Sequence, residues 1–593
     1  MTIPGILEEK LSAALKAVLG EELPADFCAS VTPSADLRFG DYQSNAAMVL
    51  AKRCRTNPRA LAQQVVDRMG QDGVCSLEIA GPGFINFRIK PEFYAARLLA
   101  MLADDRLGVE KVQDPKTIVI DFSAPNVAKP MHVGHIRSTI IGDALSRVAR
   151  FVGHNVITDN HIGDWGTQFG KLIAAYKHWG SREEIEKKSI HGLLDEQALA
   201  ANPIDELLRV YKDVNLMCKE KPELLDTCKA ELVKLQAGDG ENLAIWKRCV
   251  EVSKSGLSKI YDQLDIHFDY WLGESFYNDA LAPLVDGMIA AGMARESDGA
   301  ICVFSDGSVP PNEDPFLVQD KGEWRANPCI IRKADGGFLY ATTDLATLDH
   351  RIRTWGADSI WYVVGAPQAL HFRQIFSAQR RRGMDGDYRH IAFGSILGDD
   401  RKPFKTRSGD TVSLQDVLDE AIERAARVVE EKSPDMPEEE KKRVAEVVGI
   451  GAVKFAELSQ NRMTDYVFNW DKMLALQGDT APYLQNSYVR VRSIFRKLDG
   501  SPLDWSAPIQ LSEDAEIHLA RYGEVVPQVL DDCRPNVLAA YLFDLARAFH
   551  SFYEACPVLK SEGAVRHSRL ALCELTARTL KHGLGLLGIQ LPD

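Results

Sequence analysis

The chain has 593 residues, of which 45% are hydrophobic and 26% are charged, and its formal net charge is −14 at pH 7. This length requires several domains rather than one core, and the acidic total argues against broad, nonspecific nucleic-acid binding without excluding a local basic surface. No apolar run approaches the roughly 20 residues of a membrane helix, and the 11 cysteines form no CxxC pair. We therefore expect a protein of the reducing cytoplasm, with no membrane span and no structural metal.

Residues 1–112 are predicted to form a small α+β domain. The stretch "GILEEKLSAALKAVLG" has apolar residues at helical spacing and ends on a glycine that suits a helix C-terminus. "SLEIAGPGFINFRI" predicts two short strands around a Gly-Pro-Gly turn. A further helix is expected from Pro91 to near Gly108.

Residues 113–412 alternate short apolar runs with amphipathic stretches. This alternation is typical of an α/β domain with a parallel sheet and helices on its faces. The pattern breaks into charged helices and irregular stretches at about 177–327, which we interpret as an insertion. The predicted strands are "TIVIDF", "NVITDN", "GFLYATT", "SIWYVVG" and "HIAFGSIL".

Residues 413–593 contain no strand signal, and their apolar residues recur at helical spacing. Stretches such as "LQDVLDEAIERAARVVEEK" and "NVLAAYLFDLARAFHSFYEAC" are amphipathic over several turns. The last third of the chain is therefore predicted to be an all-α helix bundle.

The stretch "SAPNVAKPMHVGH" directly follows the first strand of the predicted sheet and allows four interpretations. A metal site would lack a third ligand near His132 and His135, a nucleophile would need an elbow such as GxSxG, which is absent, and two histidines can simply be satisfied at a helix start. A phosphate site accounts for more of the residues. Helix N-termini at the carboxyl ends of parallel strands bind anions, Lys129 adds positive charge, and Gly134 permits close approach to the backbone.

The longer run "SAPNVAKPMHVGHIRSTIIGDAL", followed by "GDWGTQFG", resembles the arginyl-tRNA synthetases, and "HVGH" resembles the HIGH signature of class I aminoacyl-tRNA synthetases. The resemblance covers nearly the whole chain. It implies a Rossmann-like catalytic domain at 113–412, an anticodon-binding helical domain at 413–593 and the activity of an arginine–tRNA ligase. "FGDYQSNAAM" resembles the N-terminal module of these enzymes, which implies contact between residues 1–112 and the corner of the tRNA.

A second signature is expected after the last strand of the sheet, where "FGSILGDDRKPFKTRSGDTVSL" stands. It resembles the KMSKS loop that clamps the triphosphate, but Thr406 occupies the position of the second lysine, and the resemblance implies that Lys129 supplies the missing charge. Taken alone, the same stretch would be a solvated charged loop. The resemblance assigns catalysis to Lys129, His132, His135, Lys405 and Arg407, and ATP binding to His132, Gly134, His135, Lys405 and Thr406.

A guanidinium substrate requires carboxylates and hydrogen-bond acceptors in a planar, forked arrangement. Tyr340 and Asp344 lie at i and i+4 where a strand is predicted to pass into a helix, so both could face one pocket. The alternative is that Asp344 caps the helix start. The resemblance implies that arginine is bound by Asp121, Ser123, Asn126, His135, Tyr340, Asp344 and Gln368.

The stretch "PYLQNSYVRVRSIFRK" interleaves aromatic and cationic residues. Such a surface can stack on unpaired bases and contact phosphates, although an amphipathic helix with its tyrosines in the core would give the same pattern. With the resemblance to an anticodon-binding bundle, tRNA binding is predicted for Tyr483, Tyr488, Arg490 and Arg492.

The expected partners are tRNA(Arg), L-arginine and ATP, with Mg²⁺ as part of the ATP substrate, and the chain is expected to act as a monomer. Another class I synthetase such as the cysteine enzyme would need a zinc-binding thiol set, which the cysteine spacing lacks. A noncatalytic RNA-binding paralogue would have lost the histidines or the triphosphate loop. Catalysis is expected to rest on positioning and charge stabilisation during adenylate formation.

Overall fold

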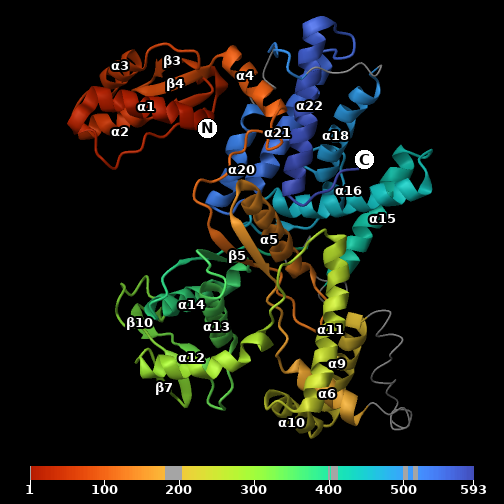
Figure 1. Ribbon diagram of the computed structural model, residues 1–593. Coiled ribbons are helices and arrows are strands. Elements are labelled where there is room, and N and C mark those ends of the chain that lie inside the picture. Colours follow the sequence, from red (N-terminus) through yellow and green to blue (C-terminus); the bar gives the residue numbers. More distant parts are fainter. Residues whose placement is uncertain are drawn as a thin grey trace.

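The computed structural model of the chain describes residues 2–179, 203–398, 401, 412–498, 505–511 and 519–592. Figure 1 shows the N-terminal region and the C-terminal helices on one side of a central parallel sheet. The helices and small sheets that interrupt the sheet region lie on the other side of it. The predicted layout, an α/β region with a parallel sheet between an N-terminal α+β region and a C-terminal helical region, is confirmed.

The N-terminal region is an antiparallel sheet of order β1-β2-β4-β3 covered by helices. The predicted hairpin is present, because β3 and β4 pair across a turn in which Gly81 and Gly83 take φ values of 52° and 139°. Its elements are helices α1 (Ile3–Leu19), α2 (Ala46–Arg53), α3 (Pro58–Met69) and α4 (Pro91–Leu102), turns η1 (Gly20–Glu22) and η2 (Leu37–Phe39), and strands β1 (Thr32–Pro33), β2 (Tyr42–Ser44), β3 (Cys75–Ala80) and β4 (Phe84–Ile89).

Helix α4 ends earlier than the sequence predicts. It stops at Leu102 rather than near Gly108. The guanidinium of Arg578, from a C-terminal helix, donates to the carbonyls of Leu102 and Asp104 at 2.6 and 2.9 Å. The Asp104 carboxylate also accepts from the Gly108 N–H at 2.8 Å. These partners satisfy the last carbonyls and the following N–H groups, so a longer helix is not required.

The central sheet has four parallel strands in the order β13-β12-β5-β6. The chain leaves β5 toward β6 on one side and later leaves β12 toward β13 on the other, so the order reverses between β5 and β12. Ligands of open parallel sheets bind at such a switch point, beyond the carboxyl ends of the strands. The elements are strands β5 (Thr117–Asp121), β6 (Asn155–Asp159), β12 (Ser359–Tyr362) and β13 (Asp387–His390), helices α5 (Val133–Val152), α13 (Tyr340–Arg353) and α14 (Ala369–Arg381), and turn η4 (Ala366–Gln368).

Two of the strand predictions in this region are wrong. "GFLYATT" is not a strand, because α13 begins at Tyr340 and its threonines are buried, with the Thr342 hydroxyl donating to the Ile331 carbonyl. Tertiary contacts of this kind override the strand propensity of β-branched residues. "HIAFGSIL" does not form one strand either, since β13 ends at His390, Phe393 forms only an isolated bridge with Gly365, and the next strand begins at Ile396.

The segment between β6 and α13 contains a group of helices followed by two small antiparallel sheets of order β11-β8-β7 and β10-β9. Helices α6 and α10 pack closely, since a Cβ at Gly170 would lie 2.4 Å from the Cys228 carbonyl oxygen. The elements are helices α6 (Gln168–His178), α9 (Pro203–Glu220), α10 (Leu224–Gln236), α11 (Gly240–Gln263) and α12 (Asn278–Ala290), turn η3 (Glu274–Tyr277), and strands β7 (Ala294–Ser297), β8 (Ala300–Val303), β9 (Leu317–Asp320), β10 (Glu323–Ala326) and β11 (Cys329–Arg332).

The described part of the C-terminal region is helical, as the sequence predicts, apart from one short strand. That strand, β15 (Tyr466–Val467), pairs in parallel with β14 (Ile396–Leu397) and ties the bundle to the chain that leaves the central sheet. Two residues are too short a run to give a periodic signal. The helices are α15 (Leu414–Lys432), α16 (Glu438–Leu458), α17 (Trp470–Met473), α18 (Ala481–Arg496), α20 (Tyr522–Asp531), α21 (Asn536–Ala555) and α22 (Gly563–Leu586).

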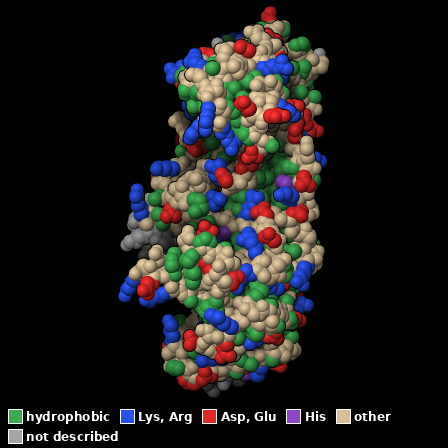
Figure 2. All heavy atoms as spheres, turned by 90° about the vertical axis from the view of Figure 1, so that its left-hand side faces the viewer, with side chains coloured by type: hydrophobic (Ala, Val, Ile, Leu, Met, Phe, Trp, Pro, Cys, Tyr) green, Lys and Arg blue, Asp and Glu red, His purple; other side chains and the backbone are tan. Residues whose placement is uncertain are grey.

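One large apolar core joins the N-terminal region, α5 and the C-terminal helices. Polar contacts cross the same boundary, since the buried Tyr42 hydroxyl donates to Glu524 of α20 at 2.9 Å. On the face in Figure 2, basic and acidic side chains are interspersed. In the described ranges, no helix combines the length and the apolar character needed to cross a membrane.

Candidate active site

The two histidines of the "HVGH" stretch form the start of helix α5, at the carboxyl end of β5. His132 is the N-cap, and its Nδ1 accepts from the Gly134 N–H at 3.0 Å. The Nδ1 of His135 accepts from the His132 N–H at 3.1 Å, and the two ring centroids lie 3.9 Å apart. Because each Nδ1 accepts a hydrogen bond, each neutral ring carries its proton on Nε2. Both rings therefore hold a hydrogen-bond donor at the helix start. The N–H groups of Val133, Gly134 and His135 already have partners, so the ring Nε2 groups rather than free backbone N–H groups are the donors offered to a ligand.

The electrostatic setting keeps both histidines neutral at pH 7. Burial, and to a lesser extent the neighbouring His132, lower the pKa of His135 to about 3. Burial also lowers the pKa of His132, whose side chain is nevertheless exposed at the surface of the site. The rings can thus donate to a phosphate oxygen without bringing a full positive charge, and any fixed positive charge has to come from other residues.

Gly134 has a packing reason to lack a side chain. A Cβ at this position would lie 2.8 Å from the His132 ring, so a larger residue would displace the capping histidine. The sequence predicted that the glycine permits close approach of a ligand. The structure adds that it permits close approach of the ring itself.

The turn between β5 and α5 has a strained backbone. Ser123, Ala124 and Ala128 all take positive φ values, of 74°, 46° and 61°. Ser123 is buried, and its hydroxyl lies 2.8 Å from Thr139 Oγ1 and 2.7 Å from the Tyr261 hydroxyl. Strain of this kind persists only where surrounding contacts hold it, and it is concentrated at functional sites.

Asn126 and Lys129, from the same turn, lie nearer the surface. The exposed Asn126 bridges in parallel to Gly163 of the "GDWGTQFG" motif, and the Gly163 N–H donates to the Pro125 carbonyl at 3.1 Å. The half-buried Lys129 points toward the insertion, with its Nζ 5.7 Å from the centre of the Tyr211 ring of α9. The turn is therefore held between the "GDWGTQFG" motif and the insertion helices.

Asp121 lies behind this turn rather than in an open pocket. Its side chain is 5% exposed and its Oδ2 lies 2.6 Å from Arg351 Nη2. A substrate group could reach this carboxylate only if the ion pair opened. This partner lies 230 residues away in the chain, and no local sequence signal indicates it. The predicted contact of Asp121 with the substrate stays a prediction.

The predicted guanidinium pocket lies beyond the carboxyl end of β12. Asp344 is in the second turn of α13, and its Oδ2 lies 2.5 Å from the Nε2 of His371 on α14. It is therefore not a helix cap. The Tyr340 ring, which is 64% exposed, lies 5.3 Å from the His371 ring. Gln368 is exposed at the N-cap of α14. The structure thus brings Tyr340, Asp344 and Gln368 to the same edge of the sheet.

Glu274 is a further carboxylate at this edge, and sequence reasoning did not identify it. Burial raises its pKa, nearby His161 lowers it, and the charges of Asp164 and Asp344 raise it. Asp164 is itself fixed, because its carboxylate accepts from the Ser275 N–H and hydroxyl at 2.8 and 2.7 Å. No spacing in the sequence links Glu274 to Asp344, since only the fold brings them together.

Three predicted residues, Lys405, Thr406 and Arg407, lie outside the described residues. The chain that follows them returns to the histidines. The Val133 N–H donates to the Val412 carbonyl at 3.0 Å, and the Leu414 N–H donates to the Met131 carbonyl at 2.8 Å. His132 and Ser413 form an antiparallel bridge. The end of the predicted triphosphate loop is therefore attached to the start of α5.

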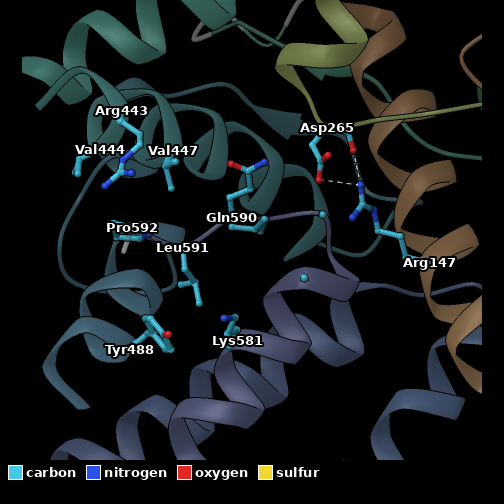
Figure 3. Close-up of a pocket in the computed structure, with 13 residues that line it drawn as sticks. Arg147, Asp265, Arg443, Val444, Val447, Tyr488, Lys581, Gln590, Leu591 and Pro592 are labelled. Atoms are coloured by element: carbon cyan, nitrogen blue, oxygen red, sulfur yellow. Dashed lines mark hydrogen bonds and ion pairs between the residues drawn. The ribbon is translucent and has the colours of Figure 1, made fainter. Parts of the chain in front are cut away.

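The four residues predicted to bind tRNA share α18 but differ in surroundings. Tyr483 packs against the rings of Phe543 and His550, and Arg492 Nη1 lies 2.9 Å from Glu574. Arg490 is exposed. Tyr488 lines a cavity of about 390 Å³ at the junction of α5, α16, α18 and α22, where Figure 3 shows it facing Leu591 and Pro592.

Among the described residues, no group of three or more histidines, cysteines, aspartates or glutamates is arranged to hold a metal ion. Magnesium held by a substrate's phosphates needs only one or two protein carboxylates.

Comparisons with known proteins agree along the whole chain. The family model "tRNA synthetases class I (R), catalytic domain" matches residues 97–470, "DALR anticodon binding domain" matches 484–593, and "Arginyl tRNA synthetase N terminal domain" matches 5–89. The chain is 45% identical over 600 residues to an arginine–tRNA ligase of Laribacter hongkongensis, covering 100% of this chain and 99% of the relative. It is 44% identical over 605 residues to that of Cellvibrio japonicus, covering all of both chains.

Solved structures give the same result. The arginyl-tRNA synthetase of Plasmodium falciparum superposes with a TM-score of 0.79 at 26% identity, covering 100% of this chain and 99% of the other. That of Thermus thermophilus shares the fold, with a TM-score of 0.78 at 24% identity and 99% of each chain covered. The chain belongs to the arginyl-tRNA synthetase family of class I aminoacyl-tRNA synthetases.

Proposed function

We propose that this chain, an arginine–tRNA ligase, forms arginyl-adenylate from L-arginine and ATP at the carboxyl edge of the sheet and transfers the arginyl group to the 3′ end of tRNA(Arg). One observation carries the assignment of the site. Neutral histidine donors lie at the start of α5, beyond the carboxyl end of β5, and the carboxylates of Asp344 and Glu274, which interact electrostatically, lie at the same edge of the sheet.

In the nucleotide half of the site, His132 and His135 donate from Nε2 to the α-phosphate, and Gly134 leaves room for the ring and the nucleotide. The substrate carboxylate attacks the α-phosphorus in line, and pyrophosphate leaves as the opposite P–O bond breaks. Lys129, Lys405 and Arg407 supply the fixed positive charge, and Thr406 contacts the nucleotide. Magnesium enters as part of the ATP substrate, bound by its phosphates.

In the arginine half, Asp344 and Glu274 pair with the substrate guanidinium while Tyr340 flanks it. The short contact with His371 fixes the orientation of the Asp344 carboxylate. Two carboxylates around one planar cation give the forked contacts that a guanidinium prefers. Asn126 and Gln368, both exposed at this edge, contact the polar end of the amino acid, and Ser123 holds the strained turn that presents Asn126.

After activation, the terminal ribose hydroxyl of the tRNA attacks the carbonyl carbon of the adenylate, and AMP leaves. No residue of the chain becomes covalently attached in either step. We assign the outer surface of α18 around Arg490 to the tRNA, with Tyr488 at its edge, and give Tyr483 and Arg492 a supporting role because their side chains are engaged within the bundle.

We propose divisions at 112 and 412, between a tRNA-contacting N-terminal domain, the catalytic domain and the anticodon-binding domain. Strand β5 starts at Thr117 and α15 starts at Leu414, which supports these positions. We also propose that the chain acts as a monomer in the cytoplasm. All 11 cysteines are free thiols, as a reducing compartment favours.

The test is ATP–pyrophosphate exchange with each of the twenty amino acids, with and without tRNA. Of the twenty amino acids, only arginine is expected to stimulate exchange. Exchange with another amino acid, and none with arginine, would overturn the proposed substrate. Comparing reactions with and without tRNA also measures whether activation depends on bound tRNA.

A further inference from the structure

A fully buried arginine lies beneath the arginine half of the site. Arg351 of α13 is 0% exposed, and its Nη2 lies 2.6 Å from Asp121 Oδ2 and 2.7 Å from Asp159 Oδ2. The guanidinium carbon also lies 5.2 Å from the centre of the Tyr362 ring. Burying a guanidinium costs several kcal/mol unless it is paired, so the two carboxylates are required where they stand. The chain thus contains, near its substrate site, the same chemical group that it binds as substrate.

This guanidinium joins the segments that carry the proposed pocket. Asp121 ends β5 and precedes the strained turn. Asp159 ends β6, and its Oδ1 accepts from the Leu272 N–H at 3.2 Å, two residues before Glu274. Arg351 lies seven residues after Asp344, on the same face of α13. One side chain therefore links the backbone positions of the turn, Glu274 and Asp344.

The same contacts determine which carboxylates remain for a ligand. Asp121 and Asp159 sit at the ends of adjacent strands of the sheet edge, and both already have a guanidinium partner. A substrate guanidinium is thereby directed away from them. The selectivity of a binding site often depends on making incorrect binding modes unfavourable as well as on providing the correct contacts.

We propose that Arg351 is a positioning and specificity-determining residue for arginine activation: it pairs with both Asp121 and Asp159 and fixes α13 so that Asp344 and Glu274 receive the substrate guanidinium. It does not touch the reacting atoms. The inference rests on the proposed function, since that function assigns Asp344 and Glu274 to the substrate.

The sharpest test is chemical rescue of the full-length Arg351→Ala variant. Removing one member of a buried ionic cluster is strongly destabilising locally, so kcat/KM for arginine in pyrophosphate exchange is expected to fall by about a hundredfold, with KM for ATP changed by less than about threefold. Guanidinium chloride at about 10 mM should fill the space left by the side chain and restore exchange at least about tenfold. In the wild-type chain the same salt should only inhibit, in competition with arginine.

Arg353→Ala is the matched control, because Arg353 lies two residues away on the same helix and is exposed. It should behave as wild type with and without guanidinium. If guanidinium inhibits the Arg351→Ala variant as it inhibits wild type, or if KM for ATP rises as much as KM for arginine, the inference is wrong.

If circular dichroism shows that Arg351→Ala does not fold, two further variants still test the inference. Arg351→Lys retains the charge but loses the fork, and Asp159→Asn retains Arg351 but replaces one of its two carboxylate partners with a neutral amide. Both should raise KM for arginine by about tenfold and leave KM for ATP nearly unchanged. Unchanged KM for arginine in both would overturn the inference. Failure of the wild-type chain to exchange with arginine would instead overturn the proposed function.

Discussion

The two halves of the candidate site are built in opposite ways. In the nucleotide half, His132 and His135 bond to backbone groups within three residues of themselves, and both rings are neutral. In the arginine half, the groups are charged and come from strands and helices far apart in the chain, as with Asp344 and Glu274. The first half follows from a local helix-capping pattern, whereas the second exists only after the whole sheet has assembled.

The difference matches what each substrate requires. A phosphate that gains charge in the transition state is stabilised by donors already in place, which need not carry a charge themselves. A guanidinium is a permanent cation, so its binding site must offer ionised carboxylates. The desolvation cost of burying those carboxylates must be offset by fixed hydrogen-bond or ionic partners. The arginine half should therefore be the more sensitive to loss of one charge.

The largest effect is expected from Asp344→Asn. Removing one partner of a partly buried, hydrogen-bonded charge pair costs about 2–5 kcal/mol, so kcat/KM for arginine should fall by about a hundredfold to a thousandfold, mostly through KM. Pyrophosphate exchange at varied arginine and varied ATP separates the two substrates. Asp335→Asn, at a side chain that is 71% exposed, is the control and should have no effect. A rise in KM for ATP of equal size would show that Asp344 does not select the amino acid.

A somewhat smaller effect, on the other half of the site, is expected from His135→Ala. Losing one preorganised donor typically lowers kcat by about a hundredfold or more, and here KM for arginine should change little. The measurement is single-turnover adenylate formation at saturating arginine. His267→Ala replaces a histidine that is 75% exposed and should retain full activity. Near-normal adenylate formation by the His135 variant would contradict the proposed role of the His135 ring as a donor to the α-phosphate.

The same contrast explains how much the sequence could predict. Strands such as β5 and β12 have short apolar runs, and α5 begins at a run of capping residues, so each is encoded within about ten neighbouring residues. The histidine site could be predicted for that reason. The helical C-terminal third could be predicted as well, because amphipathic periodicity persists through each of its long helices.

The sequence could not show which carboxylates are already used. Asp121 at a strand end has the position of a ligand group, yet its partner Arg351 is 230 residues away. Glu274 gives no local signal, because its proximity to Asp344 arises from the fold of the insertion. Tyr340 was predicted at a strand end and instead starts a helix, since buried contacts of the adjacent threonines outweigh their strand propensity.

A third test asks whether exposed and paired charges also differ on α18. Arg490 is exposed and contacts the rings of His550 and Tyr553, whereas Arg492 forms an ion pair with Glu574. Arg490→Ala should weaken tRNA binding by about fivefold and reduce the salt dependence of binding by about one phosphate contact. Arg492→Ala should change the thermal midpoint more than it changes tRNA affinity. Filter binding over a series of salt concentrations provides the measurement, and equal affinity losses in the two variants would contradict the distinction.

The smallest effect is expected in the pH dependence of stability, and it concerns His135 in the nucleotide half of the site. Burial holds the pKa of His135 at about 3, whereas an unfolded histidine takes up its proton near pH 6.5. Between these values the unfolded state binds more protons than the native state, so this group lowers stability as the pH falls from 6.5 toward 3. His135→Asn removes that proton uptake and can still accept from the His132 N–H. The thermal midpoint of the variant should therefore fall less steeply than that of wild type between pH 7 and pH 5, by about 2 °C. His267→Asn is the exposed control. Equal slopes of the thermal midpoint against pH for wild type and both variants would mean that the fold does not hold His135 neutral.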